Sequence, residues 1–341
     1  MRGMSELPPP TASTPGPEGQ EALVVRVDSR QCDIRLDDGD MAPALLRGKL
    51  FENRGRDKHP VAVGDRVRLA RDSAEEGWAI EEVLPRRNAF GRRVAGEDYD
   101  LRQVLATNVD QVVVVNSLGL PPFSSIVADR ILATCSFAGI PSVMVLNKID
   151  KAKRRKLEKI VTSYANAESP VIQTSAIEGD GVEELRECLV GKTSVLYGLS
   201  GAGKSTLMNA LDQSLELETR EVSASLSSGR HTTTFSRWYP LQDGGAVIDT
   251  PGVRKFRPFG IPPHELRLHF PELRERGAEC HYPACMHRGE PQCAVEAALA
   301  EDLIPASRYR SYLELLSELE EVYGGTGSNE PKSGPDHKTR R

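Results

Sequence analysis

A glycine-rich loop at residues 198–205, GLSGAGKS, constrains this chain more than any other feature. It matches the pattern G-x-x-x-x-G-K-[ST], follows the apolar run TSVLY and precedes the helix-like run STLMNAL. In that context the loop N–H groups surround a phosphate, and the following helix directs its positive end at it. The loop therefore predicts an α/β nucleotide-binding domain. The residues expected to contact the phosphates are Gly198, Leu199, Ser200, Gly201, Ala202, Gly203, Lys204, Ser205 and Thr206.

Within this loop two side chains have predicted chemical roles. We expect Lys204 to reach the β- and γ-phosphate oxygens, and the Ser205 hydroxyl to ligate Mg²⁺. Both are therefore candidate catalytic residues.

A second motif, NKID at 147–150, closes the apolar run PSVMVL. A carboxylate at Asp150 can accept hydrogen bonds from N1–H and the exocyclic amine of guanine, a donor pair that adenine lacks. Asn147 and Lys148, with Ile149 between them and Asp150, would hold the loop and cover the base. Ser175 and Ala176 end the next apolar run and can offer a backbone N–H to the guanine O6. These residues predict GTP as the ligand, and the alternative of an ATP-using enzyme conflicts with Asp150.

The order of these motifs is unusual. NKID and the TSA at 174–176 precede the phosphate loop, while three threonines at 232–234 and DTPG at 249–252 follow it. This is the usual GTPase order rotated, with no element missing, and rotation is tolerated because domain termini often lie close together. Within DTPG, Asp249 can hold Mg²⁺ through water and the Gly252 N–H can contact the γ-phosphate. We therefore expect a circularly permuted GTPase domain.

The remaining apolar pattern divides the chain. From residue 21 to 84 five short alternating runs separated by turns predict a small antiparallel barrel, with the OB fold as its form. Apolar runs then alternate with helix-like segments, typical of a mostly parallel sheet covered on both faces. We expect a multidomain protein with these parts: a disordered tail at 1–20, an OB-fold domain at 21–85, a strand-poor linker at 86–105, a permuted α/β P-loop GTPase domain at 106–257, a helical zinc-binding domain at 258–324 and a flexible tail at 325–341.

A cluster of metal-ligating side chains lies in the predicted helical domain. Cys280, Cys285, His287 and Cys293 offer three thiolates and one imidazole, the donors of a closed structural zinc site. His281 is an alternative to His287 as the imidazole ligand. The other three cysteines stand in apolar contexts and are expected in the core.

Composition excludes several classes of protein. No apolar run reaches the eighteen or so residues that a membrane span needs, and the first residues lack the apolar core of a signal peptide. A net charge of −5 gives no overall indication of a nucleic-acid-binding protein, although this average hides local basic runs. We expect a cytoplasmic monomer with no membrane or DNA partner.

Taken together, the chain resembles the small-ribosomal-subunit biogenesis GTPase RsgA (YjeQ) family over residues 21–322. The marks are NKID, GLSGAGKST, GRHTTT at 229–234, DTPGVRKF at 249–256 and the cysteine pattern, which favours His287 as ligand. The resemblance implies GTP hydrolysis stimulated by the small ribosomal subunit, and a role late in its assembly. The alternative is a GTP-binding RNA chaperone or scaffold with incidental hydrolysis.

The residue that orients the attacking water is open. Val253 stands where many GTPases have Gln, and valine cannot orient water. His231 is the candidate replacement, as the family pattern also suggests, and the alternative is that it contacts ribosomal RNA. Thr233, or one of its two neighbours, would close onto Mg²⁺ and the γ-phosphate. Lys255 stands where the family pattern has an acidic residue.

Three basic runs are candidate contacts for ribosomal RNA. Phosphate contacts by such side chains supply salt-dependent affinity rather than sequence readout. The alternative for each run is a solvated surface. The runs are Arg47, Lys49, Arg54, Arg56 and Lys58; Arg86, Arg87, Arg92 and Arg93; and KAKRRK at 151–156.

Overall fold

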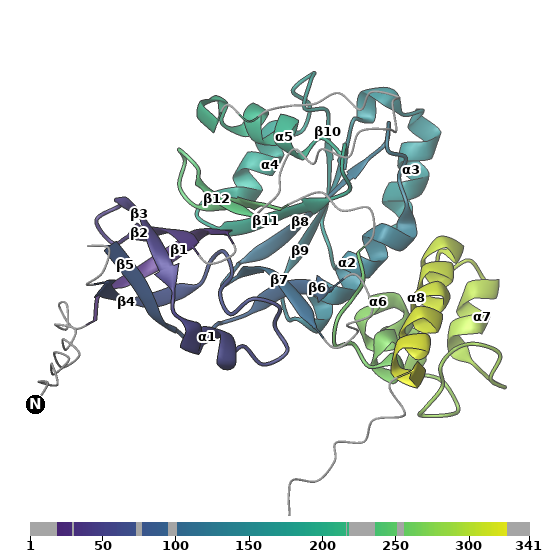
Figure 1. Ribbon diagram of the computed structural model, residues 1–341. Coiled ribbons are helices and arrows are strands. Elements are labelled where there is room, and N and C mark those ends of the chain that lie inside the picture. Colours follow the sequence, from purple (N-terminus) through teal and green to yellow (C-terminus); the bar gives the residue numbers. More distant parts are fainter. Residues whose placement is uncertain are drawn as a thin grey trace, which may run out of the picture.

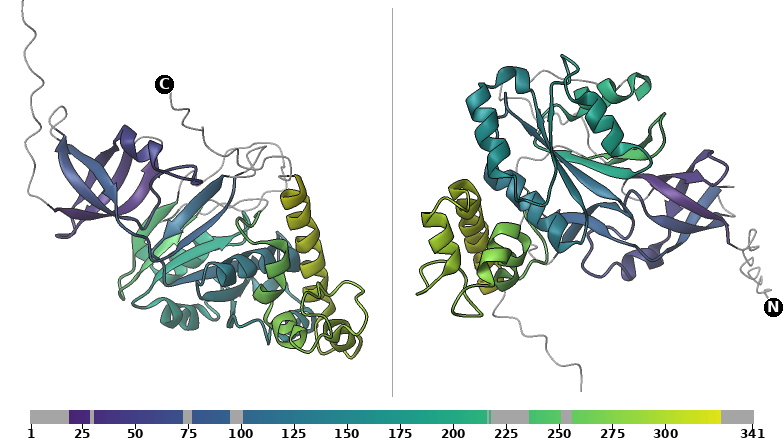
Figure 2. Two further views of the ribbon diagram at one scale, coloured as in Figure 1. Left: turned by 90° about the horizontal axis from the view of Figure 1, so that it is seen from below. Right: turned by 180° about the vertical axis from the view of Figure 1, so that it is seen from behind.

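The computed structural model describes residues 19–28, 31–72, 77–94, 101–215, 217, 236–250 and 256–325. A small β-barrel lies at one end, a helix-covered sheet in the middle and a group of helices at the other end (Figure 1). The two further views in Figure 2 show the barrel and the C-terminal helices on opposite sides of the central sheet. The three predicted parts are therefore present in the predicted order.

The barrel is formed by five strands in the order β1-β2-β3-β5-β4, and it closes because β4 also pairs with β1. The β3–β5 pair is parallel and the others are antiparallel, with a helix between β3 and β4, as in an OB fold. Alternate side chains such as Val24, Ile34 and Ile80 fill the interior. The elements are β1 Glu21–Asp28, β2 Gln31–Leu36, β3 Met41–Leu46, α1 Gly48–Glu52, β4 Arg66–Asp72 and β5 Gly77–Val83.

The central sheet has the strand order β10-β9-β8-β11-β13-β12. All its neighbouring pairs are parallel except β12–β13. This confirms the predicted sheet, although the short strand β12 was not foreseen. The strands are β8 Gln111–Ser117, β9 Ser142–Asn147, β10 Val171–Thr174, β11 Thr193–Gly198, β12 Arg237–Pro240 and β13 Ala246–Asp249.

Helices cover both faces of the central sheet. Successive residues of a strand point to opposite faces. Accordingly, Val112 and Val114 of β8 pack with α2 and α3, whereas Val113 and Val115 pack with α4 and α5. The helices are α2 Ser125–Phe137, α3 Arg154–Ser163, α4 Val182–Leu189 and α5 Lys204–Leu211, with short 3₁₀ turns η1 Ile149–Lys151 and η2 Gln213–Leu215.

The segment 86–105 differs from the strand-poor linker that we expected. It carries β6 (Ala89–Arg93) and the start of β7 (Arg102–Thr107), which form an antiparallel hairpin. Phe90 is fully buried and packs in the core of the central domain. The linker expectation was wrong because a few well-placed apolar residues suffice to anchor a polar hairpin to an existing core.

The C-terminal helices surround a separate core that includes Phe270, Tyr312 and two of the cysteines. Ala133 of α2 belongs to the same core, so these helices are docked directly on the central domain. Within the described residues, no helix is both long and apolar enough to cross a membrane. The elements are η3 Pro263–His269, α6 Pro271–Gly277, α7 Ala294–Ala300 and α8 Ala306–Gly325.

One strand contact joins the barrel to the central sheet. Arg26 of β1 pairs with Arg237 of β12, which makes the two sheets continuous. The guanidinium of Arg35 on β2 also lies over the Trp238 ring of β12, 5.5 Å from its centroid. The barrel is therefore in contact with the strand next to β13, which ends at Asp249.

Candidate functional site

The predicted phosphate loop connects the end of β11 to the first residue of α5. Gly201 and Gly203 have φ values of 80° and 95°, which glycine adopts without strain. A Cβ at Gly198 would lie 2.2 Å from the Val115 carbonyl oxygen, so this position is also closed to other residues. The remaining loop residues Leu199, Ser200, Ala202, Ser205 and Thr206 lie between these points or in the first turn of α5.

Lys204 lies across the phosphate loop. Its ammonium group donates to the Gly198 carbonyl oxygen at 3.1 Å, and the residue is buried. Burial lowers the pKa of Lys204, and the charge of Asp249 opposes this effect. A lysine held over a ring of backbone N–H groups is placed to bind the phosphate oxygens that those groups surround.

Asp249 ends β13 opposite Leu196 of β11, at the same edge of the sheet as the phosphate loop. Burial raises the pKa of Asp249 to about 6, although the Lys204 charge opposes this. Its Oδ1 is buried and, among the described residues, has no hydrogen-bond partner. A buried carboxylate oxygen of this kind fits Mg²⁺ with its water shell, so the residues present suit that ion.

The base motif NKID directly contacts the phosphate loop. The Asn147 amide donates to the Ala202 carbonyl oxygen at 3.0 Å. Lys148, which has a φ of 63°, donates to the Gly201 carbonyl oxygen at 2.7 Å. A Cβ on Gly203 would stand 2.3 Å from the Asn147 amide nitrogen. The base end and the phosphate end of the site are thus held together by side chains of a single motif.

Asp150 lies beside the loop after β10. The Ser175 hydroxyl donates to Asp150 Oδ1 at 2.8 Å, and Lys151 forms an ion pair with Oδ2 at 3.0 Å. The hydrogen bond from Ser175, opposed by partial burial and supported by Lys151, lowers the pKa of Asp150. An ionised carboxylate is purely an acceptor, which is what the two guanine donors require.

The TSA residues contact both polar side chains of the base motif. The Ser175 N–H donates to the Asp180 carbonyl oxygen at 3.0 Å. The Ala176 N–H faces Asn147 Oδ1 at 3.3 Å, and the Thr174 hydroxyl donates to the same oxygen at 3.1 Å. The three residues therefore help to orient Asn147 and Asp150, and the contact of a TSA backbone N–H with the guanine O6 stays a prediction.

Sequence reasoning missed the loop that follows β8. The Leu118 N–H donates to the Asn147 carbonyl oxygen at 2.9 Å, and Lys148 also donates to the Leu120 carbonyl oxygen at 2.7 Å. The available signal was topological, because the carboxyl end of β8 lies between those of β9 and β11, where ligands of such sheets bind. The predicted site residues His231, Thr233 and Gly252, together with Lys255, lie outside the described residues.

The four predicted zinc ligands converge in the C-terminal helices. Their ligand atoms lie within 4.8 Å of one another. His287 Nδ1 is 3.6 Å from the Cys280 sulfur and 3.5 Å from the Cys293 sulfur. Burial raises the pKa of the Cys285 thiol to about 12, so a bound cation is needed to hold it as thiolate. Three sulfurs and one nitrogen fit a tetrahedral zinc site.

His281 stands outside this cluster. Its ring packs on Tyr282, with 4.7 Å between the ring centroids. The His287 backbone is fixed instead, since the Tyr309 hydroxyl donates to its carbonyl oxygen at 2.6 Å. The arrangement thus favours His287, as the family pattern implied.

Comparison with known proteins identifies relatives along nearly the whole chain. The sequence model of the RsgA GTPase family matches residues 83–258. The small ribosomal subunit biogenesis GTPase RsgA of Bacteroides fragilis is 37% identical over 305 residues, covering 88% of this chain and 97% of the relative. The protein of the same name from Chlorobaculum parvum is 41% identical over 311 residues, covering 89% and 99%.

Solved structures agree with this assignment. The crystal structure of YjeQ from Thermotoga maritima is 32% identical, with a TM-score of 0.67 over 88% of this chain and 98% of that one. The structure of YloQ, described as a circularly permuted GTPase, has a TM-score of 0.65 over 89% and 96% of the two chains. At 24% identity the second match speaks for the fold alone.

Proposed function

We propose a function for this chain from the premise that it belongs to the RsgA GTPase family. It is a hydrolase that converts GTP to GDP and phosphate, and it acts in the maturation of the small ribosomal subunit. The finer proposal is that subunit binding stimulates hydrolysis, which serves as a late checkpoint of assembly. The supporting observation is the bond between Asn147 and Ala202, because it unites base and phosphate recognition in one site.

In the proposed mechanism each residue acts on one part of the nucleotide. Asp150 selects guanine, and Lys204 binds the β- and γ-phosphate oxygens. Ser205 directly, and Asp249 through water, would hold Mg²⁺, which neutralises the charge that develops on the phosphates. Because these groups are prearranged, they stabilise the transition state with little reorganisation. His231 remains our candidate for orienting the attacking water.

Turnover assays test this function. GTP hydrolysis should be measured with and without purified small subunits for the wild type and for Lys204→Ala. We expect the substitution to lower turnover at least about 100-fold in both conditions, as for loss of one preorganised transition-state contact. Lys192→Ala is the matched control, since Lys192 stands at the other end of β11 near Gln111. Unchanged assembly of small subunits with the Lys204 variant would favour the scaffold alternative.

Nucleotide preference tests the base site separately. Asp150→Asn replaces an acceptor with a donor, so the variant should prefer xanthosine triphosphate over GTP. Competition binding of the two nucleotides measures this. If the variant kept the wild-type preference for GTP, the assignment of Asp150 would be wrong.

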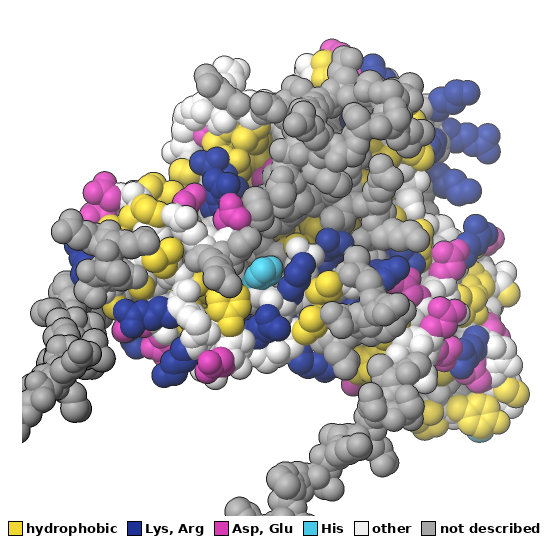
Figure 3. All heavy atoms as spheres, viewed as in Figure 1, with side chains coloured by type: hydrophobic (Ala, Val, Ile, Leu, Met, Phe, Trp, Pro, Cys, Tyr) yellow, Lys and Arg dark blue, Asp and Glu magenta, His cyan; other side chains and the backbone are white. Residues whose placement is uncertain are grey.

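The remaining proposals concern metal, RNA and cellular place. We infer one structural zinc bound by Cys280, Cys285, His287 and Cys293, and a monomer that works in the cytoplasm, where its ribosomal target lies. Figure 3 shows Lys and Arg side chains gathered on the face between the barrel and the C-terminal helices, and others at the edge that bears α3. We propose that ribosomal RNA contacts these surfaces, with neither DNA nor membrane as a partner.

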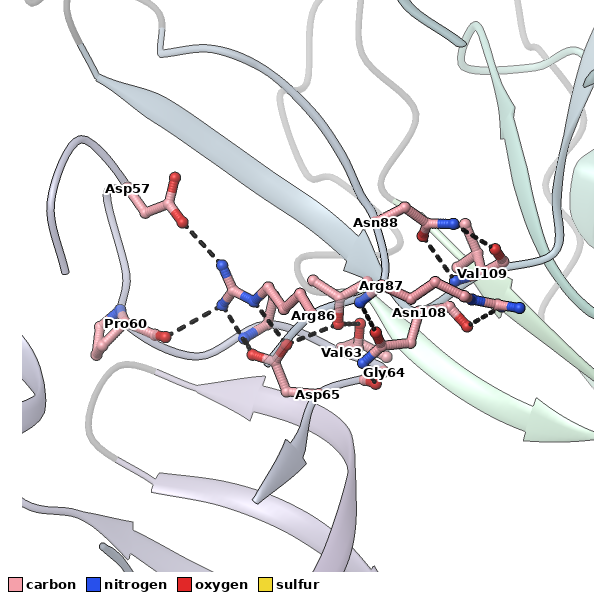
Figure 4. A network of polar contacts seen from close by, with 12 residues as sticks. Asp57, Pro60, Val63, Gly64, Asp65, Arg86, Arg87, Asn88, Asn108 and Val109 are labelled. Atoms are coloured by element: carbon pink, nitrogen blue, oxygen red, sulfur yellow. Dashed lines mark hydrogen bonds and ion pairs between the residues drawn. The ribbon is translucent and has the colours of Figure 1, made fainter. Parts of the chain in front are cut away.

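One of the three basic runs is largely structural. Arg86 is 18% exposed and forms ion pairs with Asp57 at 2.8 Å and with Asp65 at 2.7 Å (Figure 4). Arg87 pairs with Asp110 at 2.7 Å, and Arg93 is 3% exposed. In contrast, Arg154 at the start of α3 is 91% exposed. The RNA proposal therefore rests on the barrel loop and on α3.

A further inference from the structure

A cavity of about 250 Å³ lies outside the nucleotide site. Its wall comes from β6, β7, the end of α2 and the segment that leads from the central domain to the C-terminal helices. The residues that shape it are Gly91, Arg102, Phe137, Phe259 and Gly260. Because α2 ends at Phe137 shortly before β9 begins, this junction pocket lies at the amino edge of the sheet, opposite the nucleotide.

The walls of the junction pocket combine aromatic rings with a guanidinium group. Phe137 is 38% exposed although it is a large apolar residue. The Arg102 guanidinium lies 6.0 Å from the centroid of the Phe259 ring, and that of Arg56 lies 5.4 Å from it. Planar apolar and cationic groups of this kind are the surfaces on which unpaired bases stack.

Two glycines line the junction pocket. Gly260 has a φ of +86°, and a Cβ there would lie 3.3 Å from the Phe137 ring. A Cβ on Gly91 would lie 2.8 Å from the Gln103 carbonyl oxygen, at the bulge of the hairpin. The cavity is smaller than the roughly 300–1,000 Å³ of drug-sized sites, so it suits one ring system.

A cationic loop of the barrel runs beside the pocket. The Arg102 N–H donates to the Arg56 carbonyl oxygen, and the Lys58 N–H donates to the Arg102 carbonyl oxygen, both at 2.8 Å. This loop also carries Arg54. Its two acids are already engaged, Asp57 by Arg86 and Arg102 and Asp65 by Arg86. The rim is therefore positively charged.

The charges of this loop also act on the neighbouring His59, as a smaller effect than its burial. Burial, followed by the charges of Lys58 and Arg54, lowers the pKa of His59. Cations repel the protonated imidazole, so an anion brought to this loop would meet an attractive potential.

We propose that the junction pocket binds one unstacked base of an RNA segment whose adjoining phosphates contact Arg54, Arg56 and Lys58. The proposal rests on the proposed function for the identity of the partner as RNA. It goes further in assigning a base-binding pocket at the meeting point of the barrel loop, the hairpin and the C-terminal segment. A purely apolar peptide would make no use of the cationic rim, and an acidic peptide would make little use of the aromatic walls.

The test separates stacking from phosphate contact. Binding of a short single-stranded RNA to the full zinc-loaded chain is measured by fluorescence anisotropy at several salt concentrations. Phe137→Ala should weaken binding roughly 5- to 100-fold with the salt dependence unchanged, since it removes a stacking surface. Arg56→Gln and Lys58→Gln should each make the negative slope of log K against log salt shallower by about one. Tyr323→Ala, which removes an exposed ring from α8, should change neither quantity.

A second measurement uses the wild-type chain, so folding of a variant does not matter. RNA carrying 4-thiouridine is irradiated on the protein, and crosslinked peptides are identified. Crosslinks to the peptides that contain Phe137 or Phe259 support the proposal. Crosslinks confined to other surfaces overturn it, as does equal displacement of the RNA by polyglutamate together with an unchanged affinity of Phe137→Ala.

These outcomes are distinct from failure of the proposed function. If wild-type turnover is not stimulated by small subunits and no RNA binds, the function itself is wrong. If stimulation and RNA binding are present but Phe137→Ala matches the wild type, only the junction pocket is wrong. Turnover without subunits should be the same in Phe137→Ala and wild type, because Phe137 lies away from the nucleotide site.

Discussion

The two junctions between domains use the same chemistry in different surroundings. At the barrel, Arg86 binds Asp57 and Asp65 (Figure 4). At the C-terminal helices, Arg308 of α8 binds Glu272 of α6 and Asp129 of α2. The first arginine is 18% exposed, whereas the second is 2% exposed.

The partners of the two arginines also differ. Both carboxylates of Arg86 belong to one barrel loop. They also accept from two residues of β7, since the Thr107 hydroxyl donates to Asp65 at 2.8 Å and Arg102 donates to Asp57 at 2.7 Å. The carboxylates of Arg308 come from two domains, and its guanidinium lies 5.0 Å from the Tyr164 ring, which follows α3. Arg86 therefore fixes the conformation of a barrel loop, whereas Arg308 holds two domains together. We expect the loss of Arg308 to destabilise its junction more than the loss of Arg86.

Removal of zinc should have the largest effect, and it should affect the two junctions differently. Structural zinc contributes on the order of 10 kcal/mol to folding of small metal domains. We expect a chelator to unfold the C-terminal helices and with them the Arg308 junction, while the barrel and the central domain keep their structure. Hydrogen exchange read by mass spectrometry should show protection lost in 256–325 alone. Protection retained there after verified zinc removal would contradict a structural role.

Substitution of Arg308 should have the next largest effect. Arg308→Ala leaves Asp129 and Glu272 buried without their counter-charge, which costs about 3–5 kcal/mol. The free energy of unfolding from urea titration measures this. Arg310→Ala, an exposed arginine on the same helix, should change it by less than about 0.5 kcal/mol. Equal effects of the two substitutions would show that Arg308 does not hold the C-terminal helices on the central domain.

Substitution of Arg86 should cost less. Arg86→Ala leaves Asp65 with the Thr107 hydroxyl and the Ala62 N–H as donors, each at 2.8 Å. We expect a loss of about 1.5–3 kcal/mol in the free energy of unfolding, the range for hydrogen bonds to a charged group. Thermal unfolding compares it with Arg87→Ala, whose exposed pair with Asp110 is worth under about 1 kcal/mol. A cost above that of Arg308→Ala would reverse our ranking of the junctions.

The smallest effect concerns Asp110, at the outer edge of the barrel junction. Partial burial raises the pKa of its carboxyl, but hydrogen bonds from the Thr193 N–H and from Arg87 outweigh this and lower it overall. The stabilisation is therefore present above the ordinary value of 3.8 and is lost as pH falls through the lower folded value. At pH 7 the free energy of unfolding of the wild type should exceed that of Asp110→Asn by under about 1 kcal/mol. This difference should disappear in acid. Urea titrations at several pH values measure it, and a difference that persisted or grew in acid would contradict the prediction.

The sequence predicted what local patterns encode. The phosphate loop and NKID were recognisable because each function needs a fixed spacing of particular residues. The β6–β7 hairpin was missed because Phe90 stands among polar residues, and β12 because it has only four residues, none of them buried. The bond between Arg308 and Asp129 joins residues 179 positions apart, and no local pattern announces such a pair.

The amide of Asn147 has an evolutionary consequence. Since it grips the carbonyl of Ala202 and leaves no room for a side chain on Gly203, a mutation that loosens one half of the pocket disturbs the other. We therefore expect substitutions that change the purine selectivity of the site to weaken its affinity for the triphosphate as well. In the evolution of such a protein, the barrel and the C-terminal helices should accept sequence change more readily than the nucleotide site.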